Sequence, residues 1–343
     1  MYDLVIKNGT LVTDRETVQA DIAVDKESIA AIGHGLAGRE EIDASGRLIF
    51  PGGIDAHTHM ALPVSGTRSS DDFFTGTRAA ACGGVTTIVD FTLGSSETTI
   101  PEDIERRRKA AQPAVIDYGF HGEVIGWQPG QEAQFEEALG LGVNTFKFYT
   151  AYAASGRRSD NGILYHAFQA LADLDGVALI HCEDEAIIDS ILRQLSKKEL
   201  GRMANLAISR PPICEESAIA QVAYLTQHTG VRAHIVHVSS GLGLATVRQA
   251  KRQGIRITAE TCPQYLLLDS DLYDRRDGHL LSATPALRTK QDQAQLWRGL
   301  ADGTLDLVAT DHCPFTREQK RWNGSFLDLP YGLPGVETLL PIM

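Results

Sequence analysis

Two histidines separated by a single residue, His57 and His59, end the stretch PGGIDAHTH at residues 51–59. Side chains alternate between the two faces of an extended strand, so both imidazoles are expected on the same side. Two imidazoles that point the same way can bind a divalent metal ion. The pair by itself is equally consistent with histidines that cap a strand, so its interpretation depends on the other polar residues of the chain.

Three more residues of metal-ligand type follow later strand-like runs. His181 comes directly after the run 177–180, His237 lies in HIVHVSS, and Asp311 lies in ATDHCPF. Each alone has an ordinary explanation, such as a buried histidine with a partner or a carboxylate that caps a loop. Their recurrence favours a shared site, because the carboxyl ends of a barrel's strands converge on one face. Imidazoles together with a carboxylate suit zinc and neighbouring divalent ions.

Lys147 lies inside an apolar strand-like run, TFKFY at residues 145–149. A charged lysine there is costly unless it is paired, so one interpretation is an ion pair or a side chain that reaches solvent. A second interpretation is chemical modification, because burial lowers the pKa of a lysine and leaves a nucleophilic amine. Such an amine can take up carbon dioxide and become a carbamate, whose two oxygens can bridge two metal ions.

Apolar runs of strand length alternate with helix-like stretches over most of the chain. Eight such runs occur, at 48–54, 86–91, 115–120, 144–148, 177–180, 233–238, 255–259 and 305–309. The helix-like stretches include 71–82, 103–111, 132–139, 216–227 and 243–252. The pattern predicts an α/β fold, a (β/α)8 TIM-like barrel, with an open doubly wound sheet as the alternative. We favour the barrel, because ionisable residues recur at strand ends, where a barrel's active site lies.

The first 50 residues differ from the rest, because β-rich runs alternate with turns and no helix-length amphipathic segment occurs. The runs are 4–6, 22–24 and 29–32, with typical turn pairs at Asn8-Gly9 and Ser45-Gly46. We therefore predict a small β-sandwich portion at 1–50 and the barrel at 51–343. The chain stops at GVETLLPIM, so we expect the last barrel helix to be incomplete.

Composition argues against several classes of protein. The 343 residues carry a formal charge of −12 without a Lys/Arg-rich run, so nucleic acid is not an expected partner. No apolar stretch reaches the ~18 residues of a membrane span, and the N-terminus lacks a signal pattern. The five cysteines are scattered without a C-x-x-C spacing. A disulfide framework and a cysteine-type zinc site are therefore not expected, and a reducing cytoplasm fits best.

As a whole, the chain resembles the cyclic amidohydrolases, and most closely the dihydropyrimidinase/hydantoinase family. The resemblance rests on segments in the family's order and spacing: PGGIDAHTHM, SSDDFFTGTRAAACGGVTTIVDF, FKFYTAY, SRPPICEESAIAQ, HIVHVSS, AETCPQYLLLD, LWRGL and LVATDHCPF. It implies an enzyme with a barrel and a small β-sandwich domain, and a homotetramer. Relatives continue with a last helix and further strands, so the C-terminal part of the family pattern is missing here.

The resemblance also implies a pair of divalent metal ions, with zinc favoured over manganese or cobalt. By this resemblance, N6-carboxylated Lys147 bridges the two ions together with a hydroxide. The ligands of the more buried ion would be His57, His59 and Asp311, and those of the other ion His181 and His237. Two ions ~3.5–4 Å apart acidify a bridging water and clamp the reacting oxygens.

The implied reaction is hydrolysis of a ring amide to an N-carbamoyl amino acid. The resemblance implies that Tyr152, five residues after Lys147, hydrogen-bonds the substrate oxygen and stabilises its developing charge. Asp311 is expected to take the proton of the attacking hydroxide and to pass it to the leaving ring nitrogen. Without the resemblance, Tyr152 would be interpreted as an ordinary aromatic residue at the rim of the barrel.

Specificity is expected to depend on the loop that follows the metal histidines. Dihydroorotases and many relatives carry Arg or Asn two residues after the second histidine, where this chain has Ala61. The absence of a cation there favours a neutral ring, a dihydropyrimidine or a hydantoin, unless Arg288 substitutes. Leu62 and Val64 are expected to line a pocket that accepts apolar substituents.

Two further candidate substrate contacts depart from the family pattern. Thr284 stands where the family usually has Ser, and Tyr331 stands where it often has Asn. Both positions are expected to hold the ring largely through backbone groups. Three alternatives stay open at this point: an allantoinase, a dihydroorotase, and a relative without catalytic activity. Retention of all six candidate metal ligands argues against the last of these.

Overall fold

A computed structural model describes residues 1–64 and 66–343. The chain divides into two compact units, Met1–Gly53 and Ile54–Met343. The change in sequence pattern lies between residues 50 and 51, three residues before this division. No helix among the described residues is long and apolar enough to cross a membrane.

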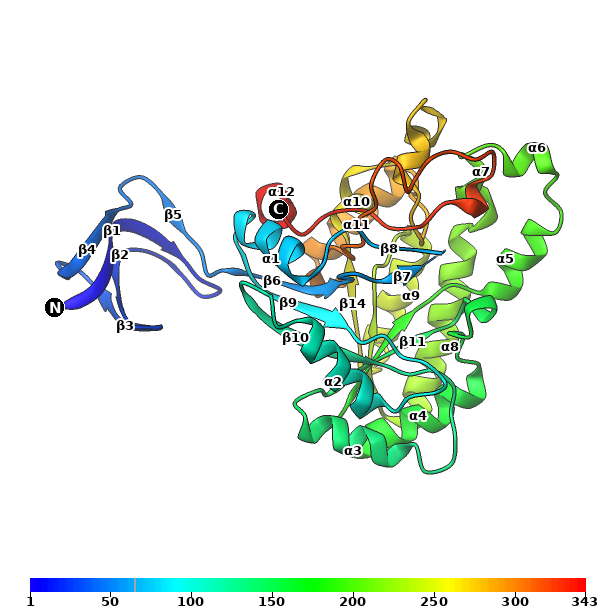
Figure 1. Cartoon of the computed structure of the whole chain (residues 1–343), viewed down its shortest axis with the longest axis horizontal. Coiled ribbons are helices and arrows are strands. Elements are labelled where there is room, and N and C mark those ends of the chain that lie inside the picture. Colours follow the sequence, from blue (N-terminus) through cyan, green and yellow to red (C-terminus); the bar gives the residue numbers. More distant parts are fainter. Residues whose placement is uncertain (65) are drawn as a thin grey trace. The chain divides into compact units, whose positions relative to one another are not determined.

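The first unit is a single mixed β-sheet with the order β3-β2-β1-β4, in which β5 also pairs with β1 (Figure 1). β1 is antiparallel to β2 and parallel to β4 and β5. The strands are β1 (Tyr2–Val12), β2 (Thr17–Asp25), β3 (Ser28–Gly33), β4 (Gly38–Asp43) and β5 (Leu48–Ile49). The described residues of this unit form one sheet, so the β-sandwich portion at 1–50 stays a prediction.

A bulge shapes β1 at the predicted turn pair Asn8-Gly9. The pairing with β2 shifts register between Ile6 and Gly9, and Asn8 has a φ of 62°. A Cβ on Gly9 would lie 2.3 Å from Cδ1 of Ile49, so any larger residue there would force the Ile49 side chain to move. The pair therefore bends a strand rather than ending it.

The second unit is a nearly closed parallel barrel whose sheet runs in the order β15-β14-β13-β12-β11-β10-β9-β6. The strands are β6 (Gly53–Thr58), β9 (Val85–Phe91), β10 (Asp117–Glu123), β11 (Thr145–Tyr149), β12 (Val177–His181), β13 (Arg232–Ile235), β14 (Ile257–Thr261) and β15 (Leu307–Val308). A parallel bridge from Thr58 to His312 brings the chain after β15 back to β6. This bridge confirms the barrel and excludes the open sheet.

One predicted strand, 48–54, is wrong. Leu48 and Ile49 pair with β1 in the first unit, and the barrel strand begins only at Gly53. The physical reason lies at Pro51, which has no N–H to donate to a strand ladder and so separates two strands within one apolar run. Another predicted strand, 115–120, is shifted to Asp117–Glu123.

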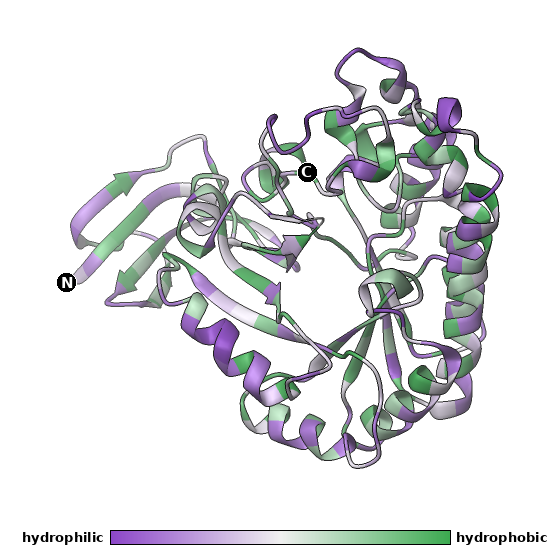
Figure 2. Ribbon diagram, turned by 45° about the vertical axis from the view of Figure 1, so that its right-hand side comes forward, coloured by the Kyte–Doolittle hydropathy of each residue, from purple (hydrophilic) through white to green (hydrophobic). Residues whose placement is uncertain are grey.

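Helices lie around the outside of the barrel strands (Figure 1) and carry both hydrophobic and hydrophilic positions (Figure 2). The longer ones are α1 (Phe73–Cys82), α2 (Ile100–Ala110), α3 (Glu132–Gly140), α4 (Asn161–Asp173), α5 (Glu185–Leu192), α8 (Pro212–Thr229), α9 (Gly241–Arg252) and α11 (Lys290–Ala301). Short helices α6 (Lys197–Leu200), α7 (Asn205–Ser209) and α10 (Pro263–Leu267) lie in the connections, and α12 (Leu339–Ile342) is the last element. Side-chain capping fixes several starts, such as the reciprocal Asp72–Thr75 bonds before α1.

The alternation of side chains along β11 explains how a lysine comes to face the barrel interior. Phe146 packs against Phe135 of α3 with ring centroids 4.6 Å apart, and Phe148 packs against Phe168 of α4 at 5.8 Å. Both phenylalanines therefore point outward to the helices. Lys147, between them in sequence, points to the opposite side of the strand, toward the barrel axis.

Candidate metal centre and active site

One cavity of about 860 Å³ in the second unit contains the candidate metal ligands and substrate contacts predicted from the sequence, although Ala61 is not among its lining residues. They are His57, His59, Leu62, Val64, Lys147, Tyr152, His181, His237, Thr284, Asp311 and Tyr331. His57, Lys147 and His181 lie on the strands β6, β11 and β12. The other residues lie in the segments that follow β6, β11, β13 and β15, or in two later loops. The size of the cavity falls within the ~300–1,000 Å³ typical of small-molecule sites.

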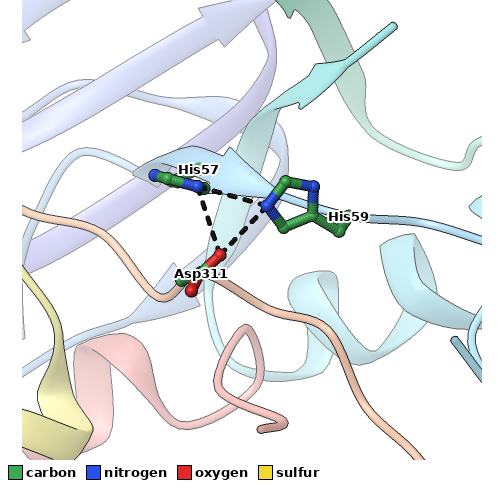
Figure 3. Close-up of side chains that lie close together, drawn as sticks. All are labelled: His57, His59 and Asp311. Atoms are coloured by element: carbon green, nitrogen blue, oxygen red, sulfur yellow. Dashed lines mark hydrogen bonds and ion pairs between the residues drawn. The ribbon is translucent and has the colours of Figure 1, made fainter. Parts of the chain in front are cut away.

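His57, His59 and Asp311 converge on one point, as Figure 3 shows. The Nε2 atoms of the two histidines lie 3.2 Å apart, and Asp311 Oδ1 lies 3.2 Å from the first and 3.0 Å from the second. Burial alone would raise the pKa of Asp311, but His57 and His59 hold it well below its usual value. The trio therefore offers two ring nitrogens and an ionised carboxylate to the same point.

Glu260, a residue that the sequence analysis missed, orients His57. Its Oε1 lies 2.5 Å from His57 Nδ1, and its Oε2 lies 3.2 Å from His234 Nε2. Burial opposes protonation of His57, but the charges of Glu260 and Asp311 outweigh it and raise the pKa of His57 to about 9. A carboxylate on the far nitrogen fixes the tautomer of a metal-binding histidine. The available signal was an acidic residue inside the apolar strand ITAET.

His181 and His237 form a second facing pair. His181 Nδ1 lies 2.9 Å from His237 Nε2, and both rings are buried. Burial first, and then the charges of His181 and Lys147, lower the pKa of His237 well below 6.5. Burial likewise lowers the pKa of His181. Both rings are therefore neutral near pH 7, the form in which imidazole binds a metal ion.

A buried carboxylate also orients the second pair. Glu183 Oε2 lies 2.9 Å from His181 Nε2, and the same carboxylate accepts two bonds from Arg210, at 3.0 and 2.7 Å. Despite complete burial, Arg210 and His181 hold the pKa of Glu183 below its usual range. His181 is thereby held with Nδ1 toward His237. The sequence signal was the HCED segment at 181–184, which received no functional interpretation.

Lys147 is 1% exposed and lines the same cavity. Its Nζ lies 4.9 Å from the ring centre of Phe91 and 5.2 Å from that of Tyr149. No ion pair to Lys147 occurs within residues 1–64 and 66–343, so the pairing interpretation is not supported there. Burial lowers the pKa of Lys147 to about 8 despite the raising effect of Asp311 and Glu260.

The donor set fits a metal centre. Ring nitrogens 3.2 Å apart, with a carboxylate oxygen against both, are the arrangement that a divalent cation stabilises. Ligand atoms of His57, His59 and Asp311 all lie within 4.8 Å of one another. The rings of His57 and His237 have centroids 5.6 Å apart, so the second histidine pair lies beside this trio.

Several of these residues have unusual backbone conformations. Tyr152, His237 and Asp311 have φ values of 74°, 42° and 52°, which non-glycine residues rarely adopt. Ala61 behaves likewise, with a φ of 49°. A strained backbone conformation of this kind persists only where surrounding contacts hold it in place, and such conformations are frequent at functional sites. Here it turns the chain sharply just after β11, β13 and β15.

The substrate side of the cavity is defined by Tyr152 and two loops. The hydroxyl of Tyr152 lies 2.8 Å from Thr284 Oγ1. The hydroxyl of Tyr331 donates to the carbonyl of Phe326 at 3.0 Å, so its aromatic ring rather than a free hydroxyl shapes the cavity. Burial raises the pKa of Tyr152 above its usual value, so this hydroxyl stays protonated and able to donate.

The cavity also contains cations that the sequence analysis did not place there. Arg157 and Arg210 line it, whereas Arg288, the substitute considered for position 61, is not among its lining residues. Arg288 is buried, and its Nε donates to Ser239 Oγ at 3.0 Å. Arg157 could not be recognised from sequence, because nothing in GRRSD indicates which arginine turns inward.

These features define the class: a metal-dependent hydrolase barrel with imidazole and carboxylate ligands at the carboxyl ends of its strands. The chain belongs to the amidohydrolase family, whose family model matches residues 48–332. Membership confirms the fold class and the resemblance inferred from the sequence motifs.

Named relatives indicate which branch of the amidohydrolase family this chain resembles. The chain is 38% identical to the D-phenylhydantoinase of Escherichia coli O17:K52:H18 over 348 aligned positions, which cover 99% of this chain and 75% of the relative. A dihydropyrimidinase structure from Brevibacillus agri NCHU1002 superposes with a TM-score of 0.93 at 35% identity, covering 97% of this chain and 74% of that one. The L-hydantoinase of Arthrobacter aurescens gives 0.90 at 29% identity, covering 100% and 76%.

Proposed function

We propose that the chain hydrolyses the ring amide of uncharged five- and six-membered cyclic ureides, hydantoins and 5,6-dihydropyrimidines, to N-carbamoyl amino acids. Its relatives and its family place it among the hydrolases of cyclic amides. One observation carries the proposal: two facing histidine pairs, Asp311 and Lys147 meet in a single cavity large enough for such a ring.

We further propose that the site holds two divalent ions, with zinc favoured, and that Lys147 is carboxylated. His57, His59 and Asp311 would hold one ion, and His181 and His237 the other. When bound, the ions would supply an acidified water and a Lewis acid for the ring carbonyl.

The position of Lys147 supports its carboxylation. Its pKa of about 8 leaves a usable fraction of neutral amine near pH 7. That amine forms a bond to the carbon of carbon dioxide and releases one proton, which gives a carbamate with one negative charge. In the described part of the chain no carboxylate is paired with Nζ, so carboxylation would break no ion pair, and the neutral rings of His181 and His237 line the same cavity.

The side chains of this chain can supply the proton transfers. Asp311, ionised and set beside both metal histidines, would accept a proton from the attacking water and deliver it to the leaving ring nitrogen. The protonated hydroxyl of Tyr152 would donate to the oxyanion of the tetrahedral intermediate. Loss of one such donor typically costs ~10²–10³ in rate.

The loop after β6 supports an uncharged ring. Ala61 offers no cation, and Arg288 is occupied elsewhere. An unpaired substrate carboxylate held directly against this loop would lose several kcal/mol of hydration. The alternatives, an allantoinase or a dihydroorotase, need polar or cationic partners at that position.

A substrate panel tests the proposal. Protein loaded with zinc, manganese or cobalt is assayed on dihydrouracil, 5-substituted hydantoins, allantoin and dihydroorotate, with metal content measured on the same samples. We expect close to two ions per chain and the highest kcat/KM on dihydrouracil or a hydantoin. A metal content near zero that loading cannot raise would favour the non-catalytic relative, and dihydroorotate or allantoin as the best substrate would favour the alternatives.

Two further proposals rest on the resemblance and on cysteine chemistry. A homotetramer is proposed from the family alone, and light scattering of the purified chain tests it. A cytoplasmic location is proposed because Cys82, Cys182, Cys214, Cys262 and Cys313 are all free thiols in the structure.

A further inference from the structure

Arg157 lines the active-site cavity from a segment that the catalytic scheme does not use. It follows the short 3-10 helix η1 (Ala153–Ser155) and Gly156, whose φ of 73° turns the chain. Its Nε donates to Glu123 Oε1 at 3.0 Å, and Glu123 Oε2 accepts from the backbone N–H of Gly94 at 2.7 Å. The guanidinium is therefore anchored through one nitrogen to a carboxylate that is itself fixed.

The two terminal nitrogens of Arg157 distinguish it from the other arginine of the cavity. Arg210 presents Nε and Nη2 to both oxygens of Glu183, so its bidentate edge is occupied. In Arg157, Nε is the only nitrogen that bonds to a carboxylate in the described part of the chain. Its side chain is 27% exposed, and the guanidinium also hydrogen-bonds the Tyr149 hydroxyl, which is a neutral partner. No carboxylate among the described residues bonds to Nη1 or Nη2, so this edge can accept the carboxylate of a ligand.

The charge of Arg157 persists at any pH at which the enzyme works. Burial would lower its pKa, but Glu123 outweighs burial and raises it. Because Glu123 is negatively charged, the Arg157–Glu123 pair attracts a distant anion less strongly than a lone arginine would. At hydrogen-bond distance, however, the outer edge still presents two N–H groups in the geometry that matches a carboxylate.

The remaining rim of the cavity suits a hydrocarbon linker. Leu62 and the short strand β7 (Pro63–Val64), which follow β6, line the same cavity. At about 860 Å³ the cavity has room for a ring and an exocyclic chain. A ligand whose methylene groups contact this apolar segment and whose end is anionic would use both features.

We propose that Arg157 is a specificity-determining residue that selects cyclic ureides whose exocyclic side chain ends in a carboxylate. The inference rests on the proposed function and names its substrate class. The ring stays uncharged, and the anion lies on the side chain rather than on the ring. Hydrolysis would add water across the ring amide and leave the side chain unchanged, so the product would be the N-carbamoyl derivative of an acidic amino acid.

The test compares two probes that differ in one group. 5-(2-Carboxyethyl)hydantoin carries the anion, and 5-(2-carbamoylethyl)hydantoin is its uncharged counterpart of nearly the same shape. For the metal-loaded wild-type enzyme we expect kcat/KM to favour the acid by about tenfold to a hundredfold, the range of one hydrogen-bonded charge pair. Arg157→Met should reduce this ratio to about one or below.

Matched variants separate recognition from folding. Arg158, the next residue, pairs with Glu185 at 3.3 Å and is not among the lining residues, so Arg158→Met should keep the ratio. Arg157→Met leaves Glu123 without its cation, so the double variant Glu123→Gln/Arg157→Met repeats the test without an unpaired carboxylate. Arg157→Lys keeps the positive charge but not the paired N–H donors of the guanidinium. It should therefore give an intermediate ratio of kcat/KM for the two probes.

The outcomes distinguish the two proposals. Equal rates on both probes in the wild-type enzyme, or a preference for the acid that survives in both Arg157→Met variants, would overturn the role of Arg157 and leave cyclic ureide hydrolysis intact. Absence of turnover on both probes and on dihydrouracil, with the metal site filled, would instead overturn the proposed function.

Discussion

Lys320 connects two segments of the cavity wall and offers a sharp test of how the wall is held. Its side chain is 2% exposed, and Nζ donates to the carbonyls of Leu280, Ser282 and Gly332 at 3.0, 2.9 and 2.6 Å. Ser282 lies two residues before Thr284, and Gly332 directly follows Tyr331. One ammonium therefore links the two loops that carry the candidate substrate contacts.

Lys320→Met keeps the length of the side chain and removes all three donors. Burial lowers the pKa of Lys320 to about 7, but three carbonyl acceptors favour the ammonium form, which alone can donate to all of them. At ~1 kcal/mol net for each bond lost, the variant should be about 3 kcal/mol less stable. For a unit as large as Ile54–Met343, unfolding entropy of ~2.1 cal/mol/K per residue converts this to a fall in Tm of about 5 °C.

The same variant should weaken substrate binding more than chemistry. The loops of Thr284 and Tyr331 loosen, while the metal ligands lie elsewhere, so KM should rise by about tenfold, equivalent to ~1.4 kcal/mol, with metal content retained. Calorimetry and steady-state kinetics measure the two effects. Lys251→Met is the matched control, because its Nζ bonds to Gly303 O at 3.1 Å and Asp306 at 2.7 Å outside the cavity. A Tm within about 1 °C of wild type for Lys320→Met would refute the claim that the three hydrogen bonds together stabilise the unit by about 3 kcal/mol.

Three other predictions concern the proposed metal centre. Lys147→Ala should lose most activity and bind less metal, and added short carboxylic acids should restore part of both; full occupancy with normal turnover would show that no bridge is needed. Asp311→Asn should keep the fold by circular dichroism but lose turnover by several orders of magnitude, and a loss below about tenfold would assign the proton transfer to another group. Glu260→Gln should weaken metal affinity by ~10–100-fold in competition with a chelator, because His57 loses the carboxylate that fixes its tautomer; unchanged affinity would contradict the orienting role.

The sequence by itself determined where the proposed metal-binding side chains lie along the chain. Alternation along TFKFY and PGGIDAHTH fixes which side chains face the barrel axis, because a strand has a period of two. Right-handed parallel connections then bring strand ends together on one face, so the order of strands and helices along the chain was enough to assign His181, His237 and Asp311 to the same site. The same local rules failed at residues 48–54, since a run of apolar residues does not show which sheet it joins.

Only the tertiary structure decided which groups orient these ligands and which shape the substrate pocket. His57 and Glu260 are 203 residues apart, and the three carbonyls around Lys320 come from segments 12 to 40 residues away. No period or short motif encodes such contacts, because they depend on how whole elements pack. Arg157 and Arg158 are adjacent and identical in type, yet only Arg157 lines the cavity. The turn at Gly156 and the anchor on Glu123 make that choice, and both exist only in the folded chain.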